Sequence, residues 1–167
     1  MPVSMSSVAV PTFEQTLGAL SKILDKAAAH CAAKKIDQAV IMQMRLSPDM
    51  LPFVKQVQIA ADFAKNCVGR MTGEPPKYED NEKTFDELKA RIAKTLDYVR
   101  SHKAADLDAA SDKDVSFPVG PNNMTLKGTA FLVHFVLPNF YFHSATAYNI
   151  LRQAGVEIGK RDFLNRA

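Results

Sequence analysis

Apolar residues recur every three to four positions in three stretches of the chain, the spacing that places them on one face of an α-helix. The first stripe consists of Phe13, Leu17, Leu20, Leu24, Ala27 and Cys31. The second consists of Leu51, Val54, Val57, Ala61, Ala64 and Val68, and the third of Phe85, Leu88, Ile92, Leu96 and Val99. A helix with one apolar stripe is stable when that stripe is buried against other elements. The sequence therefore predicts three amphipathic helices that pack together.

Residues with capping properties predict where the first two helices begin. Thr12 and Gln15 form a capping-box pattern directly after Pro11, so we expect the first helix to begin near Pro11. The segment 47–49 has the sequence Ser-Pro-Asp, which combines an N-cap residue, a proline suited to the first helical turn and an acidic residue. It predicts that the second helix begins there and continues to about Met71.

Two further sequence patterns predict the start of the third helix and a β-hairpin. Thr84 and Glu87 form a second capping box, which predicts that the third helix begins at this point. Further along, Val115, Phe117 and Val119 alternate with other residues, and a Gly-Pro-Asn-Asn turn sequence follows them. Alternation followed by turn residues is typical of a β-hairpin, which we expect before the last helix.

The segment 127–153 is apolar nearly all round, so we expect the fourth helix to be the most buried of the four. Pro138 removes one backbone hydrogen bond and predicts a kink. Gly155 is the residue type expected just beyond a helix C-terminus. Together the four helices predict an all-α protein, a single four-helix-bundle domain over residues 1–167.

Charge and composition argue against two classes of partner. The formal net charge is only +3, and the basic residues are scattered, so we expect no nucleic-acid partner. The N-terminal residues lack the features of an export signal, and Phe131–Leu151 holds too many polar residues to face lipid. We therefore expect a cytoplasmic protein without a membrane partner. Cys31 and Cys67 fall on helical stretches and are expected to be reduced core thiols.

Polar residues on the predicted helices are the candidates for chemistry, because a buried polar group must be paired or functional. Asn139 and His143 are four residues apart and share a helix face. On the second helix, Gln56 and Gln58 could face a central pocket, or at least one of them could point to solvent. Tyr141 lies between Asn139 and His143 in the sequence. The chain contains no recognisable nucleophile triad, CxxC pair or phosphate-binding loop.

Four segments resemble one protein family in their order and spacing. They are PDMLPFVKQVQIAADFAK, GEPP, TFDELKARIAKTL and LPNFYFHSATAYNILRQAGVEIGKRDFL, of which the last is the most specific. The family is a domain-of-unknown-function family of the DinB/YfiT-like superfamily of four-helix-bundle metalloenzymes. The resemblance covers roughly Phe13 to Leu164, and it implies an up-down-down-up bundle that forms a homodimer.

The resemblance also implies the position of a metal. In the superfamily three histidines hold a divalent ion, one from the second helix and two from an HxxxH segment of the fourth. Relative to Gly155, the second HxxxH histidine corresponds to His143 and the first to Asn139, while the helix-two ligand falls near Gln56 or Gln58. At most one of the three ligands is present. We therefore expect no catalytic metal and no other cofactor.

Three functions fit these residues. The first is a metal-free binding or scaffold protein, with a polar internal pocket for a small ligand lined by Gln56, Gln58, Asn139, Tyr141 and His143. The alternative is a small-thiol-dependent transferase or isomerase, in which His143 is the general acid/base and Asn139 orients the substrate. The third is a protein that acts only through surface interactions.

Overall fold

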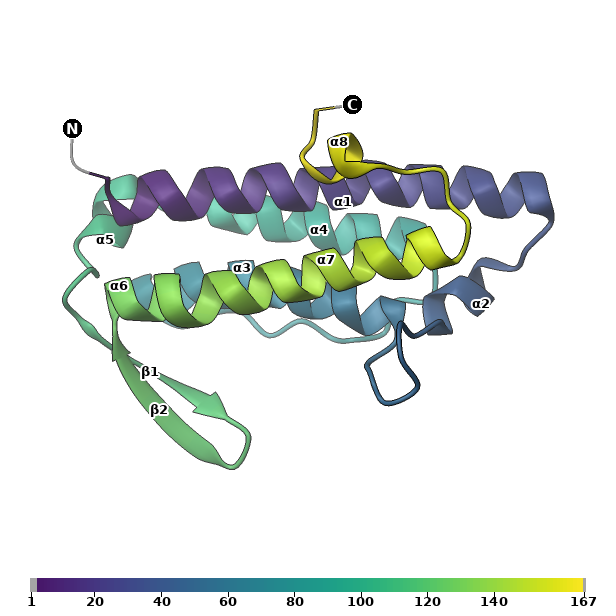
Figure 1. The fold of residues 1–167 in the computed structure, drawn as a ribbon. Helices are drawn as coiled ribbons and strands as arrows, with labels where there is room; N and C mark the ends of the chain where they lie inside the picture. Colours follow the sequence, from purple (N-terminus) through teal and green to yellow (C-terminus); the bar gives the residue numbers. More distant parts are fainter. Residues whose placement is uncertain (1–2, 167) are drawn as a thin grey trace.

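The computed structural model describes residues 3–166 as a bundle of long helices with one projecting β-hairpin (Figure 1). The elements are α1 (Met5–Lys34), α2 (Gln38–Gln43), α3 (Phe53–Thr72), α4 (Phe85–Arg100), α5 (Ala104–Asp108), β1 (Asp114–Val119), β2 (Asn122–Lys127), α6 (Gly128–Ala130), the π-helical segment η1 (Phe131–Val136), α7 (Leu137–Gln153) and α8 (Lys160–Phe163). The four long helices α1, α3, α4 and α7 confirm the predicted four-helix bundle. None of the helices between residues 3 and 166 is both long and apolar enough to cross a membrane.

The bundle has up-down-down-up topology. Helix α1 runs in one direction, α3 and α4 both return in the opposite direction, and α7 again runs with α1 (Figure 1). Because α3 and α4 are parallel neighbours, the segment that joins them must travel the length of the bundle. That segment, residues 73–84, is called the crossover loop below.

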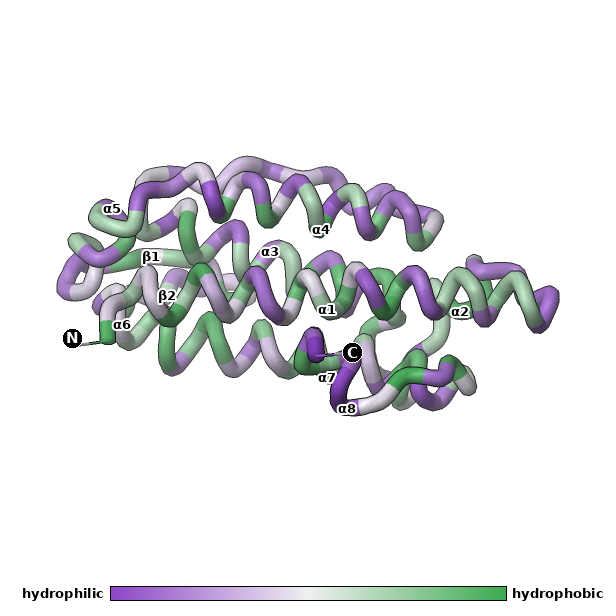
Figure 2. Tube along the Cα trace, turned by 90° about the horizontal axis from the view of Figure 1, so that it is seen from above, coloured by the Kyte–Doolittle hydropathy of each residue, from purple (hydrophilic) through white to green (hydrophobic). Residues whose placement is uncertain are grey.

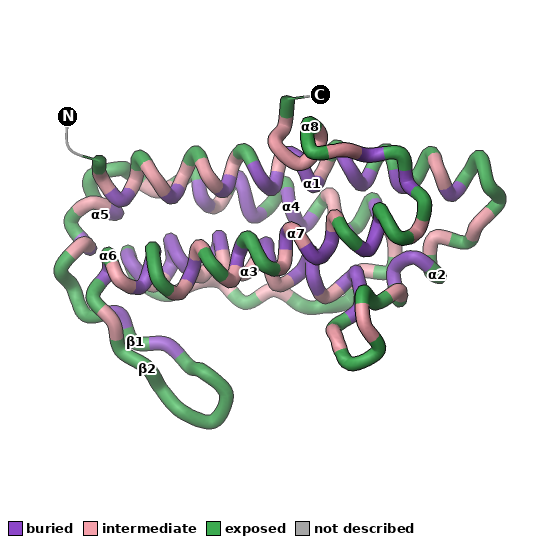
Figure 3. Tube along the Cα trace, in the orientation of Figure 1, coloured by how far each residue is buried: buried purple, intermediate pink, exposed green. Residues whose placement is uncertain are grey.

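The predicted apolar stripes form the core. In α1 all six residues of the first stripe are buried, and Phe13 packs edge-to-face on Phe140 of α7 at a centroid distance of 5.0 Å. Buried positions face inward on every long helix (Figure 3). Burying a large aliphatic side chain contributes about 1.5–3 kcal/mol, so these stripes account for the association of the helices. Cys31 and Cys67 are free thiols within this core.

The first helix begins earlier than predicted. Its first residue is Met5, its N-cap is Ser4, and Ser4 and Ser7 form the capping box that was expected from Thr12 and Gln15. The prediction was wrong because Met5 and Ala9 are buried and extend the core-facing stripe two turns before Phe13. Pro11 is tolerated inside α1 at an exposed position.

The second long helix begins later than predicted. Helix α3 begins at Phe53, after Pro52, and has no side-chain cap. The segment 47–50 instead forms a turn, in which the Ser47 hydroxyl donates to Asp49 and the Met50 amide donates to the Ser47 carbonyl. Leu51, which the stripe had included, is therefore exposed.

The capping box at the start of α4 and the hairpin are confirmed. The Thr84 side chain accepts from the Glu87 amide, and the Glu87 carboxylate accepts from the Thr84 amide. Strands β1 and β2 pair antiparallel, with Val115 opposite Leu126 and Phe117 opposite Met124. Val115 and Phe117 are buried, so one face of β1 closes the bundle.

The last helix is less buried than predicted. Val133, Tyr141 and Phe142 are 42%, 43% and 55% exposed. The first half of this helix is strongly hydrophobic (Figure 2), but the partners from α1, α3, β1 and α8 leave part of its surface uncovered. Before Pro138, at Phe131–Val136, the helix takes the π form.

The C-terminal tail folds back on α1. Gly155 has φ +85°, the left-handed conformation expected of a residue that ends a helix. Val156 and Ile158 are buried beyond it. Asp162 then pairs with Lys26 of α1 at 2.5 Å, which anchors α8.

Candidate functional site

The candidate site is centred on His143, a half-buried residue of α7 that faces α3. Its Nδ1 atom lies 2.7 Å from Oε1 of Gln56, a side chain that is 1% exposed. The imidazole ring stacks on Phe63 of α3, with a centroid distance of 5.9 Å and an interplanar angle of 19°. Phe142 contacts the ring edge-to-face at 5.2 Å. Contacts from both helices therefore fix the orientation of the imidazole.

The hydrogen bonds of Gln56 determine which nitrogen of His143 carries the proton. The Gln56 amide nitrogen donates to the Leu51 carbonyl oxygen at 3.0 Å, so the amide oxygen is the atom that faces His143. An amide oxygen can only accept, and Nδ1 must therefore carry the hydrogen. In neutral His143 the lone pair is then on Nε2. No residue between 3 and 166 donates a hydrogen bond to this nitrogen.

Burial favours the neutral form of the ring. Desolvation lowers the pKa of His143 below that of an exposed histidine, because the imidazolium form loses hydration between the helices. A neutral imidazole with a fixed tautomer can accept a hydrogen bond or a proton at Nε2. Such a group can bind a ligand by hydrogen bonding or act as a general base.

The structure brings only two of the five predicted pocket residues into direct contact. Asn139 donates from its amide nitrogen to the Phe135 carbonyl of its own helix at 2.7 Å. Gln58 is buried, but its amide donates to Glu82 of the crossover loop at 2.6 Å. Tyr141 is 43% exposed. The contact between Gln56 and His143 therefore forms the centre of the site.

Phe63 and the Leu51 carbonyl were missed in the sequence analysis. Phe63 follows Gln56 by seven residues, or two helical turns, so a signal for its position on the same face was present. The Leu51 carbonyl had no such signal, because its role depends on the late start of α3 at Phe53.

The sequence model of a family described as domain of unknown function (DUF1993) matches residues 5–164. The chain belongs to the DUF1993 family. No curated protein matches it in sequence. The DUF1993 chain is also similar to a solved structure, that of a DinB family member protein from Shewanella denitrificans, with 41% sequence identity and a TM-score of 0.88. The similarity covers 95% of this chain and 90% of the other, and it confirms the resemblance to the DinB-like fold.

The residues of this DUF1993 chain do not fit the three-histidine metal site of the superfamily. Nδ1 of His143 is bonded to Gln56, which leaves one imidazole nitrogen as a possible ligand. The other two positions hold neutral amides, which are weak ligands for divalent transition ions. Within residues 3–166, no group of three or more His, Cys, Asp or Glu side chains is arranged to hold a metal ion.

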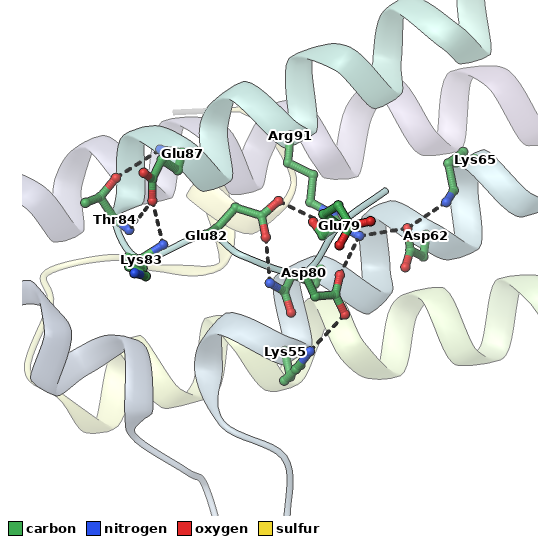
Figure 4. Close-up of polar contacts among 11 residues, drawn as sticks. Lys55, Asp62, Lys65, Glu79, Asp80, Glu82, Lys83, Thr84, Glu87 and Arg91 are labelled. Atoms are coloured by element: carbon green, nitrogen blue, oxygen red, sulfur yellow. Dashed lines mark hydrogen bonds and ion pairs between the residues drawn. The ribbon is translucent and has the colours of Figure 1, made fainter. Parts of the chain in front are cut away.

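A second polar cluster in the DUF1993 fold surrounds Arg91 of α4 (Figure 4). Its guanidinium is 2% exposed and pairs with Asp62 at 2.9 Å, Asp80 at 3.0 Å and Glu82 at 2.9 Å. It also donates to the Glu79 carbonyl oxygen at 3.0 Å. Because these partners come from α3 and the crossover loop, the cluster fixes the loop to the bundle.

Proposed function

We propose that this DUF1993 protein binds a small molecule at His143, without a catalytic metal, through a hydrogen bond that the molecule donates to Nε2. The observation that carries this proposal is the 2.7 Å contact between His143 Nδ1 and Gln56 Oε1, which leaves Nε2 as an acceptor. Phe63 and Phe142 lie against the imidazole and offer apolar surface to the rest of the ligand. A hydroxyl, amine or thiol attached to an apolar body has matching chemistry.

Asn139 belongs to the proposed site, because it lies one helical turn before His143. The Asn139 amide nitrogen is hydrogen-bonded to the Phe135 carbonyl oxygen, so its Oδ1 is left for a ligand. Tyr141 is two residues from His143 and about 200° away around α7, so it is assigned to the exposed face of the helix instead. Gln58 is assigned to the Arg91 cluster instead, because its amide donates to Glu82.

The alternative is a transferase or isomerase that uses a small thiol. In this reaction Nε2 of His143 removes the thiol proton, and the resulting thiolate attacks an electrophilic carbon of the second substrate. The carbon–sulfur bond forms as the bond to a leaving group such as halide breaks, and that group departs as an anion. The observation that favours it is the fixed tautomer, since Gln56 orients the imidazole as a general base requires. Asn139 would orient the second substrate through its free amide oxygen.

Ligand binding is tested by screening small alcohols, amines and thiols against labelled protein by NMR. His143→Gln should abolish the shifts, whereas His134→Gln, an exposed histidine two turns earlier, should leave them unchanged. Shifts that survive His143→Gln would refute the proposed site. Near-stoichiometric nickel, zinc or iron after dialysis would refute its metal-free character.

The enzyme alternative is tested by thiol transfer, with glutathione as the thiol and a chromogenic aryl halide as the acceptor. Activity that is lost in His143→Gln and kept in His134→Gln would support it. Equal rates for the two variants and the unmodified protein would exclude His143 as the base.

We also propose that two copies of the chain pair through the exposed apolar face of the last helix. Val133, Tyr141 and Phe142 are the large apolar residues that this face leaves in solvent. Light scattering should give twice the chain mass of 18.4 kDa. Phe142→Ser should shift the mass toward the monomer, while Val40→Ser on α2, also exposed, should not. A monomer for the unmodified protein would refute the pairing.

A further inference from the structure

A cavity lies away from His143, between the C-terminal half of α3, the crossover loop and the hairpin. Its volume is about 710 Å³, and it is lined by Lys65, Asn66 and Arg70 of α3, residues 73–79 of the crossover loop and Ser116 of β1. None of the residues that contact His143 lines it. It is therefore a separate place where a ligand could bind.

Charged side chains line this cavity from both α3 and the crossover loop. Lys65 and Arg70 line it from α3, and Lys77 lines it from the loop. Lys65 is already neutralised, because its Nζ lies 3.1 Å from Asp62. Lys77 shares the loop with two glutamates that also line the cavity, Glu74 and Glu79, and all three are exposed to solvent. Arg70 is therefore the charged group that remains on the α3 side.

Arg70 is the half-buried cation of this cavity, and no carboxylate among residues 3–166 forms an ion pair with it. Its guanidinium lies 5.7 Å from the centroid of the Phe117 ring, on the buried face of the hairpin. Burial lowers the pKa of Arg70, and no carboxylate or hydrogen bond within residues 3–166 counteracts that effect. A half-buried guanidinium has five donors, and these remain available to an acceptor in the cavity.

The crossover loop holds this wall in place. Gly69 lies so close to the loop that a Cβ atom at this position would be 2.5 Å from Cα of Pro75. The Gly73 amide donates the last helical hydrogen bond of α3 to the Gly69 carbonyl oxygen at 2.7 Å, so the loop begins directly after it. The loop residues thus pack tightly on α3 next to Arg70, and the cavity exists before any ligand binds.

We infer that this cavity is a binding site for a small oxyanion, a carboxylate or phosphate group, with Arg70 as its main contact. The planar guanidinium can form two parallel hydrogen bonds to either group. Lys77 adds charge from the loop, and Asn66 and Ser116 add neutral donors from the two sides. The Tyr78 ring also borders the cavity and holds the Lys65 ammonium at 4.4 Å from its centroid.

The test is an NMR titration of the full chain with sodium phosphate and with sodium acetate, at constant ionic strength set by sodium chloride. Saturable shifts at the amides of Asn66, Arg70 and Ser116 are expected with at least one of the two anions, and the stronger response identifies the preferred group. Arg70→Gln should weaken that binding at least tenfold. Arg161→Gln, which removes the same charge from an exposed position on α8, should change it less than twofold.

Arg70 also packs on Phe117, so Arg70→Gln changes both packing and binding. A second variant separates the two effects. Lys77 is exposed on the loop, so Lys77→Gln should leave the melting temperature unchanged and weaken binding about threefold. The inference is overturned if neither anion gives saturable shifts. It is also overturned if Arg161→Gln weakens binding as much as Arg70→Gln, since binding would then reflect net charge alone.

Discussion

Arg91 of α4 and Glu82 of the crossover loop form an ion pair of 2.9 Å in which the guanidinium is 2% exposed and the carboxylate 9%. This ion pair stabilises the long connection that the topology requires. Parallel neighbours such as α3 and α4 need a connection as long as the helices themselves, and a long irregular segment has few apolar contacts of its own. Arg91 attaches this segment at its middle by binding one backbone carbonyl and two carboxylates of the loop.

Replacing Arg91 should therefore destabilise the whole bundle. Arg91→Ala leaves the buried Glu82 carboxylate without its partner, and we expect a loss of about 3 kcal/mol in the free energy of unfolding, measured by urea denaturation. Arg100→Ala is the matched control, because that arginine is 53% exposed in its pair with Glu14. It should cost less than about 1 kcal/mol. Equal losses would contradict the role given to Arg91.

The contact between Gln56 and His143 predicts how the titration of the imidazole responds to charge. In Gln56→Glu a carboxylate oxygen replaces the amide oxygen beside Nδ1, and an opposite charge at this distance should raise the pKa of His143 by about one to three pH units. The pKa is read from the imidazole carbon-bound protons by NMR. Gln153→Glu, an exposed position ten residues further along α7, should leave it within a few tenths. An unchanged pKa in Gln56→Glu would show that the two side chains are not in contact.

The C-terminal tail should show a pH-dependent attachment to α1. The hydrogen bond from Lys26, followed by the one from the Gly159 amide, lowers the pKa of Asp162 below its ordinary value. A depressed carboxyl pKa stabilises the fold above the unfolded-state value of about 4, and this stabilisation is lost as the pH falls through the folded value. Asp162→Asn should thus lower Tm by about 2 °C at pH 7, and the difference should shrink as the pH falls below about 4.

Asp97→Asn provides the control for that experiment. Asp97 is 80% exposed and lies 3.8 Å from Arg100, so its replacement should leave Tm nearly unchanged across the same pH range. A difference between Asp162→Asn and the unmodified protein that stays constant as the pH is lowered from 7 into the acid range would contradict the assignment.

The two cysteines should be protected from reagents. Burial raises the pKa of Cys67 far above that of a free thiol, and burial followed by the charge of Asp37 raises the pKa of Cys31. Because the thiolate is the reactive form, both should react with a thiol reagent on the order of a hundredfold more slowly in the native protein than in urea. Cys31→Ser isolates the signal of Cys67. Rapid labelling of that variant without denaturant would contradict its burial.

Helical periodicity was sufficient to predict the bundle, because burial of an apolar stripe dominates the packing of each long helix. The ends of the helices were less predictable. The Thr12 and Gln15 pattern was a valid cap in sequence, but the buried residues Met5 and Ala9 continued the helix past it. The N-cap pattern at residues 47–49 formed a turn instead, because the helix begins only after Pro52, five residues beyond Ser47.

The site was only partly predictable for a similar reason. Spacing along one helix placed Asn139 and His143 on neighbouring turns, but the partner of His143 depended on how α3 and α7 pack. Of the two glutamines considered, Gln56 faces α7 and Gln58 faces the crossover loop, because they are two residues apart and lie about 200° apart around the helix. Arg91 was missed since a charged residue next to an apolar stripe usually reaches solvent.

The π-helical segment η1 determines how the hairpin is aimed. A π-helix has more residues per turn than an α-helix. Compared with an α-helix, these six residues therefore change the rotation, about the helix axis, of the hairpin relative to α7. Winding the same six residues as an ordinary α-helix would swing β1 and β2 by about 100° around the helix axis. Phe117 would then leave its place beside Phe131 and Phe135, and the mouth of the Arg70 cavity would lose the strand that borders it.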